Sequence, residues 1–197
     1  MKKLLSPKLG RLSLARWTVT IAFGLVLLAI GYAAVLRLTG NFHTVVSGQL
    51  YRSGQLTPAQ IAQYARKYGI KTIINLRGGD YRGEWYNDEL AEAHWLGIAH
   101  FDFPMSARRE LTVPQARRLI VLMKAARKPI LIHCQAGSDR SGLAAALYLA
   151  ALTGAGQSIA REQLSIRFGH IPLPISPEFA MDRSFERLTP VIGSLGH

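Results

Sequence analysis

The residues best suited to chemistry lie together in one ten-residue stretch, HCQAGSDRSG, at positions 133–142. Five residues separate Cys134 from Arg140, enough for a tight loop that turns the thiol and the guanidinium toward one centre. Arg140 offers a rigid, permanently charged fork that can hold two oxygens of a phosphate group. The same positive field favours the thiolate form of Cys134, which is then a nucleophile near neutral pH. Ser141 can donate a hydrogen bond to that thiolate, so the stretch predicts attack by sulfur on a phosphate ester.

The backbone of this stretch is expected to bind the anion. It lies between a predicted buried strand and a predicted helix, where backbone N–H groups and the helix dipole converge on negative charge. Gly137 permits a loop conformation in which the amides point inward. The expected phosphate-binding residues are Gln135, Ala136, Gly137, Ser138, Asp139 and Arg140. A buried structural cysteine is the alternative, but the strand, the glycine, the serine and the helix together favour a catalytic loop.

The elements around the stretch predict an α/β fold with a central, mostly parallel sheet of four to five strands flanked by helices. Strands are expected around 45–51 and at 71–76, 98–103 and 129–133. Helices are expected over about 58–68, 88–96, 112–127, 141–152, 157–168 and 177–189, with a polar loop at 77–88. Strands that alternate with helices in this way are typical of parallel sheets. The domain is expected to span residues 43–190.

The stretch at 133–142 resembles the H-C-x-x-G-x-x-R-[ST] signature of cysteine-based protein tyrosine and dual-specificity phosphatases. Upstream, GQLYRSGQLT and TIINLR are similar to the small bacterial, membrane-anchored members of that family, and the resemblance covers roughly residues 43–168. It implies a dual-specificity phosphatase-like fold and a phosphocysteine mechanism that needs no metal and no cofactor. Cys134 would attack phosphorus, Arg140 and the loop amides would bind the equatorial oxygens, and water would release phosphate.

The general acid that protonates the leaving oxygen is left open between two carboxylates. Asp102 lies 32 residues before Cys134, a separation similar to that of the acid in dual-specificity phosphatases. Alternation along its strand turns Asp102 away from the face of the two flanking phenylalanines, so it can equally be a solvated or structural residue. Asp139 stands where some bacterial relatives carry the acid, but it can instead be an orienting hydrogen-bond partner. Glu110 is a distant third candidate.

Two further residues are candidates for the pocket. Arg77 follows a predicted parallel strand, at the edge where such folds gather their sites, and is expected to line the pocket or to pair with Asp80 or Glu84. His133 is expected to be a buried, hydrogen-bonded residue that orients the loop. Trp95, at the end of a predicted helix, is expected in the core.

Composition narrows the classes of function. The 197-residue chain has 24 Lys and Arg against 12 Asp and Glu, a net charge of +12, which suits anionic partners. A charged fraction of 18% with a hydrophobic fraction of 49% excludes a disordered polymer. The single cysteine excludes an internal disulfide framework and any zinc site that needs two thiolates. Without a glycine-rich nucleotide fingerprint or interleaved aromatic and basic residues, a nucleic-acid partner is not expected.

Residues 17–36 predict a transmembrane helix, because these twenty residues are uncharged and would span about 30 Å as a helix. A cleaved signal sequence is the alternative, although its hydrophobic part usually runs only about 7–15 residues. Residues 1–16 carry five basic residues and no acidic one, whereas Arg37 alone follows the span. This asymmetry places residues 1–16 in the cytoplasm. In a bacterium, the domain would then lie outside the inner membrane on a tether at 37–50.

Three functions remain in competition. The first is a membrane-tethered phosphatase that acts on phosphotyrosine or other phosphoprotein esters. The second keeps the chemistry but takes a phospholipid head group such as phosphatidylglycerophosphate, which tethering and positive charge favour. The third is a non-catalytic phosphate-ester binder, which has no need of the reactive side chains at Cys134, Arg140 and Ser141.

Overall fold

The computed structural model describes residues 7–195, which form two compact units, one up to Val35 and one from Leu36 onward. Helix α1, Pro7–Leu38, contains a segment, Arg16–Leu38, that is long and apolar enough to cross a membrane. All residues of this segment except the partly buried Leu36 are exposed. The predicted span at 17–36 lies within it. Residues 1–6 of the predicted basic N-terminus lie outside the described residues.

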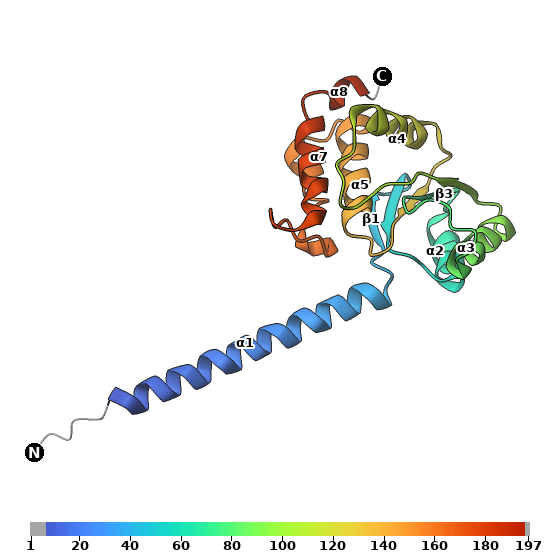
Figure 1. Ribbon diagram of the computed structural model, residues 1–197. Coiled ribbons are helices and arrows are strands. Elements are labelled where there is room, and N and C mark those ends of the chain that lie inside the picture. Colours follow the sequence, from blue (N-terminus) through green and yellow to red (C-terminus); the bar gives the residue numbers. More distant parts are fainter. Residues whose placement is uncertain (1–6, 196–197) are drawn as a thin grey trace, which may run out of the picture. The chain divides into compact units, whose positions relative to one another are not determined.

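The second unit is built on a five-stranded sheet, as predicted, with the order β1-β2-β5-β3-β4 (Figure 1). The strands are β1 His43–Val46, β2 Leu50–Ser53, β3 Thr72–Asn75, β4 Ala99–Asp102 and β5 Ile130–His133. β1 and β2 are antiparallel, and the other neighbours are parallel. The central strand is β5, which leads directly into the Cys134 stretch. In parallel sheets the carboxyl ends of the strands gather the functional groups, so this edge is where the site is expected.

Helices cover both faces of the sheet, with α2 and α3 on one side and α4, α5 and α7 on the other (Figure 1). They are α2 Pro58–Tyr68, α3 Glu84–Trp95, α4 Val113–Ala125, α5 Asp139–Leu152, α6 Gln157–Arg161, α7 Ala180–Leu188 and α8 Ile192–Leu195, with short 3₁₀ turns η1 Ile166–Phe168 and η2 Pro177–Phe179. Thr57 and Thr112 each form a capping box and are followed by a proline in the first turn. These local signals explain why both helix starts were predictable.

Alternation along the short strands divides the core into two layers. Ile74 and Ile132 pack with α4, α5 and α7, whereas Ile73 and Leu131 pack with α2 and α3. Successive side chains of a strand point to opposite faces, so both faces of these central strands are apolar.

The structure corrects four expectations about the elements. α3 begins at Glu84, so the last part of the predicted polar loop is helical, with Gly83 as its N-cap. Trp95 is 83% exposed rather than in the core. The buried face of α3 is taken by Tyr86, Glu89 and Ala93, and position 95 falls about 200° around the helix from position 93. The helices predicted over 157–168 and 177–189 each break into a short α-helix and a 3₁₀ turn.

The fourth correction concerns the connection after the span, which is shorter than a tether at 37–50. Helix α1 runs to Leu38, and β1 begins at His43, so four residues, 39–42, connect them. Two of these, Gly40 and Asn41, are buried. The Gly40 carbonyl accepts a hydrogen bond from the Gly54 N–H group (2.7 Å), so this connection is part of the folded unit.

Candidate active site

The loop of residues 134–140 turns at the carboxyl end of β5, and its last two residues begin α5. Cys134 is 2% exposed, and its N–H group donates to the Ser53 carbonyl oxygen on the neighbouring strand (3.3 Å). The loop is therefore supported on the central strands of the sheet and opens onto the positive end of a 14-residue helix. This is the placement that favours binding of an anion.

Four consecutive carbonyl groups of the loop accept hydrogen bonds from outside it. The Gln135 carbonyl accepts from the Gln55 N–H group (3.1 Å), that of Ala136 from Asn41 Nδ2 (2.9 Å), and those of Gly137 and Ser138 from Arg52 Nη2 (2.8 Å each). Because these carbonyl groups are turned outward, the N–H groups of the loop are left to face its centre. The Gly137 N–H group does so, since it donates to Cys134 Sγ at 3.3 Å. The result is a backbone nest of the kind that binds phosphate oxygens.

Gly137 is required by both conformation and space. Its φ angle is +77°, which favours glycine. A Cβ atom at this position would lie 2.5 Å from the Gly54 nitrogen and 2.7 Å from the Ser53 carbonyl carbon. The loop can therefore pack this closely against the end of β2 only with glycine at position 137.

Arg52 is a structural support of the loop that the sequence analysis missed. It is fully buried in β2, and its other terminal nitrogen, Nη1, donates to Gln163 O at 2.7 Å. Its guanidinium carbon lies 4.3 Å from the centroid of the Phe168 ring. Burial lowers the pKa of Arg52 to about 10, with Cys134 and Asp139 opposing the shift, so it stays charged at neutral pH. An arginine inside a strand that is otherwise buried is the one signal in the sequence that could have found it.

Three groups around Cys134 can stabilise a thiolate. Ser141 Oγ lies 3.6 Å from the sulfur, and the Gly137 N–H group lies at 3.3 Å. Arg140 donates from Nη1 to the Met105 carbonyl at 3.3 Å. Its buried Nε has no hydrogen-bond partner among the described residues, so this donor is available to an anion in the loop.

A carboxylate with two imidazole partners lies beside β5. Glu89 Oε1 accepts from His133 Nε2 (2.9 Å) and His100 Nε2 (2.8 Å), and Gln55 Nε2 donates to Glu89 Oε2 (2.7 Å). We call these four residues the glutamate cluster. Burial alone would raise the pKa of Glu89, but the hydrogen bonds from the two histidines and Gln55 outweigh burial and lower it to about 2. His133 is thus buried and hydrogen-bonded to Glu89.

The glutamate cluster also offers three potential metal-ligand atoms, from Glu89, His100 and His133, within 4.8 Å of one another. All three atoms are already joined by hydrogen bonds. A metal ion would have to replace those bonds, so the arrangement is self-sufficient as a hydrogen-bonded cluster.

A second cluster places one histidine between two carboxylates. His170 Nδ1 pairs with Asp139 Oδ1 at 2.7 Å, and His170 Nε2 pairs with Asp182 Oδ2 at 2.8 Å. His170 and Asp182 are buried, and Asp139 Oδ2 accepts from Ser138 Oγ at 2.8 Å. We call His170, Asp139 and Asp182 the histidine cluster. Burial opposes the charged imidazole, but the two carboxylates outweigh burial and raise the pKa of His170.

The other carboxylates considered from the sequence have structural partners. Asp102 Oδ1 accepts from Asn75 Nδ2 at 2.7 Å, and Asp102 Oδ2 accepts a hydrogen bond from the Tyr86 hydroxyl. Burial and this bond raise the pKa of Tyr86. Glu110 is paired with two arginines of α7, Arg183 at 2.8 Å and Arg187. It therefore ties α7 to the loop before α4.

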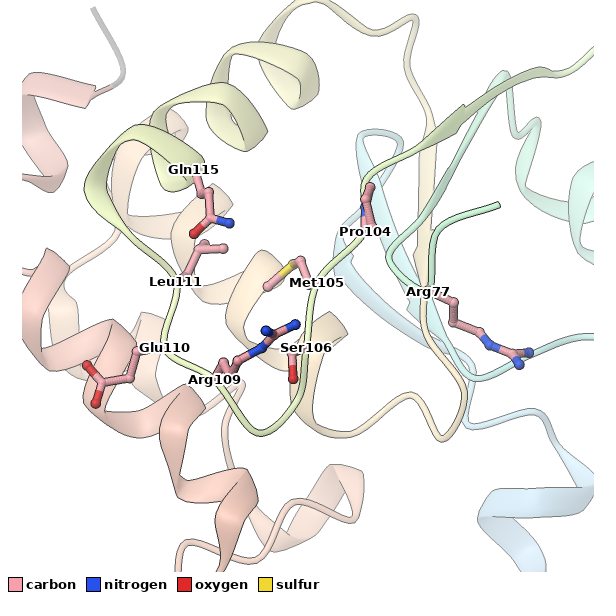
Figure 2. Close-up of a pocket in the computed structure, with 8 residues that line it drawn as sticks. All are labelled: Arg77, Pro104, Met105, Ser106, Arg109, Glu110, Leu111 and Gln115. Carbon is pink, nitrogen blue, oxygen red and sulfur yellow. The ribbon is translucent and has the colours of Figure 1, made fainter. Parts of the chain in front are cut away.

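A cavity of about 490 Å³ lies beside Glu110. Figure 2 shows the residues that line it, most of them on the segment that leads from β4 into α4, with Arg77 on a separate segment. It is lined by Arg77, Pro104, Met105, Ser106, Arg109, Glu110, Leu111 and Gln115. Arg77 donates to Gln55 Oε1 at 3.0 Å, and its guanidinium carbon lies 3.5 Å from the centroid of the Trp85 ring. Its partners are therefore Gln55 and Trp85 rather than Asp80 or Glu84. Burial lowers the pKa of Arg77, and the neighbouring charge of Arg140 adds to this effect. Arg77 and Arg140 are thus near enough for their charges to repel each other.

Comparison with known proteins decides the family. Residues 36–165, about two thirds of the chain, match the profile described as the tyrosine phosphatase family. The chain belongs to that family. It is a cysteine-based phosphatase, a phosphoric monoester hydrolase, as predicted. The matched region ends before residue 170, so two members of the histidine cluster, His170 and Asp182, lie outside it.

Solved structures show the same fold. A cysteine-to-serine variant of P. aeruginosa TpbA in complex with pTyr has a TM-score of 0.63 at 20% identity, over 80% of this chain and 88% of that one. The core catalytic domain of the PP-IP phosphatase SIW14 from S. cerevisiae, in complex with citrate, has a TM-score of 0.60 at 21% identity, over 78% of this chain and 91% of that one. PTPMT1 has a TM-score of 0.57 at 13% identity, over 78% and 99%. No curated protein sequence matches the chain.

Proposed function

We propose that this phosphatase hydrolyses phosphate monoesters with Cys134 as the nucleophile and the 134–140 loop as the phosphate cradle. The observation that carries the proposal is the set of four outward-facing carbonyl groups, held by Gln55, Asn41 and Arg52, which leaves the loop amides around the sulfur. Amides that are fixed before substrate binds stabilise the transition state without further reorganisation. Arg140 adds the charged fork that spans two equatorial oxygens.

The reaction proceeds in two displacements. The Cys134 thiolate attacks phosphorus, the bond from phosphorus to the ester oxygen breaks, and the departing oxygen takes a proton from Asp139. Water then gives a proton back to Asp139 and attacks the phosphocysteine, the sulfur–phosphorus bond breaks, and phosphate leaves. Ser141 and the Gly137 N–H group stabilise the sulfur when it departs as a thiolate. The steps use no metal or cofactor.

Asp139 is proposed as the acid rather than Asp102. Asp139 adjoins Arg140 in the loop, and its Oδ2 partner is a serine hydroxyl, which can accept a hydrogen bond as well as donate one. Asp102 pairs in register with Asn75, which also pairs with His133, so its side chain shares the face of the sheet covered by α3. There it joins the ends of β3 and β4.

For the substrate, we propose phosphotyrosine-type esters of proteins as the first candidate. The family description supports this class, and one similar structure binds pTyr. A phospholipid head-group phosphate is the second candidate. It is favoured by Arg77 and Arg109, which line the cavity, and by the apolar span that precedes the domain. The proposed topology is a single-pass anchor at Arg16–Leu38 with a cytoplasmic N-terminus and the catalytic domain on the other side of the inner membrane.

The test is phosphate release from an activated aryl phosphate by the full chain in detergent, with a chelator present. Cys134→Ser is expected to abolish turnover, and Arg140→Lys is expected to lower kcat/KM by at least about 100-fold, since a bidentate fork is replaced by a point charge. Asp139→Asn should slow esters with poor leaving groups far more than activated ones, whereas Asp102→Asn should slow both alike. Turnover that persists in Cys134→Ser would overturn the mechanism, and the reverse pattern for the two aspartates would make Asp102 the acid.

A further inference from the structure

A second exposed apolar surface lies outside the membrane-spanning segment. Residues 171–175, IPLPI, are all exposed and uncharged, and Ile171, Leu173 and Ile175 are 56%, 51% and 92% exposed. Ile166, one turn earlier, is 64% exposed. We call residues 171–175 the apolar loop. Single exposed apolar residues are ordinary, but five in succession at the tip of one loop mark a surface that meets an apolar partner.

The apolar loop stands on a fixed base. His170, the residue just before it, is fully buried and bonded to Asp139 and Asp182. Just after it, Ser176 caps the η2 turn by accepting from the Glu178 N–H group at 3.2 Å. The apolar tip is therefore held out from the domain by structure on both sides, rather than being a segment without contacts.

The partner is identified by what lies next to the base of the loop. A Cβ atom placed on Gly169 would lie 3.3 Å from Leu36 Cδ1. Leu36 is part of the apolar segment Arg16–Leu38 and stands two residues, about 3 Å along a helix, from its end. The base of the loop thus lies beside Leu36, in the last turn of the segment that is proposed to cross the bilayer.

The short connection between α1 and β1 also keeps the base of the apolar loop near the end of α1. Only residues 39–42 join α1 to β1, and Asn41 in this connection is bonded both to the Ala136 carbonyl (2.9 Å) and to the Phe168 carbonyl (2.9 Å). Four residues reach at most about 14 Å even when extended. The 134–140 loop and the base of the apolar loop are consequently fixed close to the point where the chain leaves the membrane.

We infer that the apolar loop inserts into the interface of the same bilayer that holds α1, and that the 134–140 loop is thereby presented to phosphate groups at that lipid surface. Insertion covers Ile171, Leu173 and Ile175 with lipid. The inference rests on the membrane anchor proposed above. It states that the enzyme binds its substrate at a membrane surface, where the phosphate group belongs either to a lipid or to a protein held at that surface.

The first experiment measures the depth of the loop tip. Because Cys134 is the only cysteine, Cys134→Ser provides a cysteine-free full chain. Ile175→Cys in that background is labelled with the polarity-sensitive dye NBD and reconstituted into vesicles of phosphatidylcholine with phosphatidylglycerol. The matched control is Val121→Cys, an apolar position on α4 that is 53% exposed. It lies near the end of α4, which leads into the amino end of β5, whereas the 134–140 loop follows the carboxyl end of that strand. Extraction of the vesicles at alkaline pH reports separately whether α1 holds the chain in the bilayer.

The expected result is blue-shifted emission at position 175, with quenching by spin-labelled lipid several-fold stronger than at position 121. Equal quenching by aqueous iodide at the two positions would overturn the inference. A label at 175 that is protected from iodide but not quenched by lipid would also overturn it, in favour of a protein contact. If alkaline extraction releases the chain, the anchor itself fails, and the inference fails with it.

A second experiment keeps Cys134 and compares two substrates, a phosphotyrosine peptide and the same peptide carrying an acyl chain that holds it in the vesicle. Replacing Ile171, Leu173 and Ile175 by serine is expected to lower turnover of the acylated peptide by about tenfold or more and to leave turnover of the free peptide unchanged. A tenfold change corresponds to about 1.4 kcal/mol, which is less than the free energy gained when three such side chains are buried in lipid. The control is Val121→Ser with Trp95→Ser, which changes two other exposed apolar residues. Equal loss on both peptides would overturn the inference, and absence of turnover by the unmodified chain would instead contradict the proposed function.

Discussion

The two buried clusters beside the 134–140 loop combine the same residue types in opposite ratios. In the glutamate cluster, one carboxylate accepts from two imidazoles, whereas in the histidine cluster one imidazole lies between two carboxylates. An ionised carboxylate only accepts, so each imidazole of the first cluster needs a proton on Nε2 alone and can be neutral. The single imidazole of the second cluster has a carboxyl oxygen at each nitrogen, and these two neighbours favour its charged form. The ratio of carboxylates to imidazoles thus decides whether the pKa of the carboxylate is lowered, as for Glu89, or the pKa of the imidazole is raised, as for His170.

The comparison also separates the roles of the two clusters. The glutamate cluster supports the strand side of the loop through His133, inside the region matched to the family. The histidine cluster holds the helix side through Asp139 and reaches α7, outside that region. The first cluster should therefore stabilise the fold at neutral pH and lose this effect in acid, and the second should govern both stability and catalysis near neutral pH.

The largest effect is expected when the glutamate cluster loses its carboxylate. Glu89→Leu leaves His100, His133 and Gln55 without their common acceptor in a buried site, which should cost about 3–5 kcal/mol of unfolding free energy. Urea unfolding at pH 7 measures it, with Asp88→Leu on the exposed side of α3 as control. The pKa of Glu89 is lowered to about 2, so its stabilising contribution is present above about pH 4.5 and is lost as the pH falls toward 2. A loss below about 1 kcal/mol at pH 7 would contradict the role assigned to this cluster.

The next effect is expected from His170→Gln, which removes the cation between Asp139 and Asp182. It should destabilise the fold by about 2–4 kcal/mol at pH 6, because two carboxyl groups then face each other without a cation between them. The pKa of His170 is raised, so its contribution is complete below pH 6.5 and is lost as the pH rises through that raised value. The difference between the original chain and the variant should therefore shrink from pH 6 toward pH 9. His94→Gln, an exposed histidine on α3, should show no such trend, and a difference that grows with pH would reverse the assignment.

A smaller effect, measured on catalysis, is expected from Asp182→Asn. This change leaves Asp139 in place but removes the second carboxylate, so less charge holds the imidazolium against Asp139. We expect kcat for an ester with a poor leaving group to fall about three- to tenfold, with a shifted limb of the pH–rate profile and an unchanged KM. Equal losses with an activated aryl phosphate would show that the residue supports the fold rather than the proton transfer.

The smallest effect is expected from His100→Gln in the glutamate cluster. Glu89 keeps His133 and Gln55 as partners, so the change should cost only about 0.5–1.5 kcal/mol. Thermal unfolding measures this cost, and turnover at 25 °C should stay at the original rate. A loss as large as that of Glu89→Leu would mean that the two imidazoles do not share the carboxylate.

Local patterns in the sequence were sufficient for most of the scaffold. Thr57-Pro58 and Thr112-x-Pro114 mark helix starts because the caps are satisfied within three residues, and Gly69 ends α2 in the left-handed conformation for an equally local reason. Alternating strands and helices predicted the mostly parallel sheet. The cysteine, the arginine and the loop between them were predictable because they occupy one continuous stretch beside a buried strand.

The sequence could not indicate what supports that loop, because the supporting contacts join residues far apart along the chain. Arg52 bonds to carbonyl groups 85 and 86 residues later, and Asn41 bonds to one 95 residues later. The bonds of Asp139 with His170 and of His133 with Glu89 likewise cross 31 and 44 residues. A buried polar residue must find a partner, but its own sequence neighbourhood does not say which. The sequence by itself thus determined the reactive groups and the elements that carry them, whereas the tertiary structure alone decided the charge states and the positions of those groups, because both depend on partners that only folding brings together.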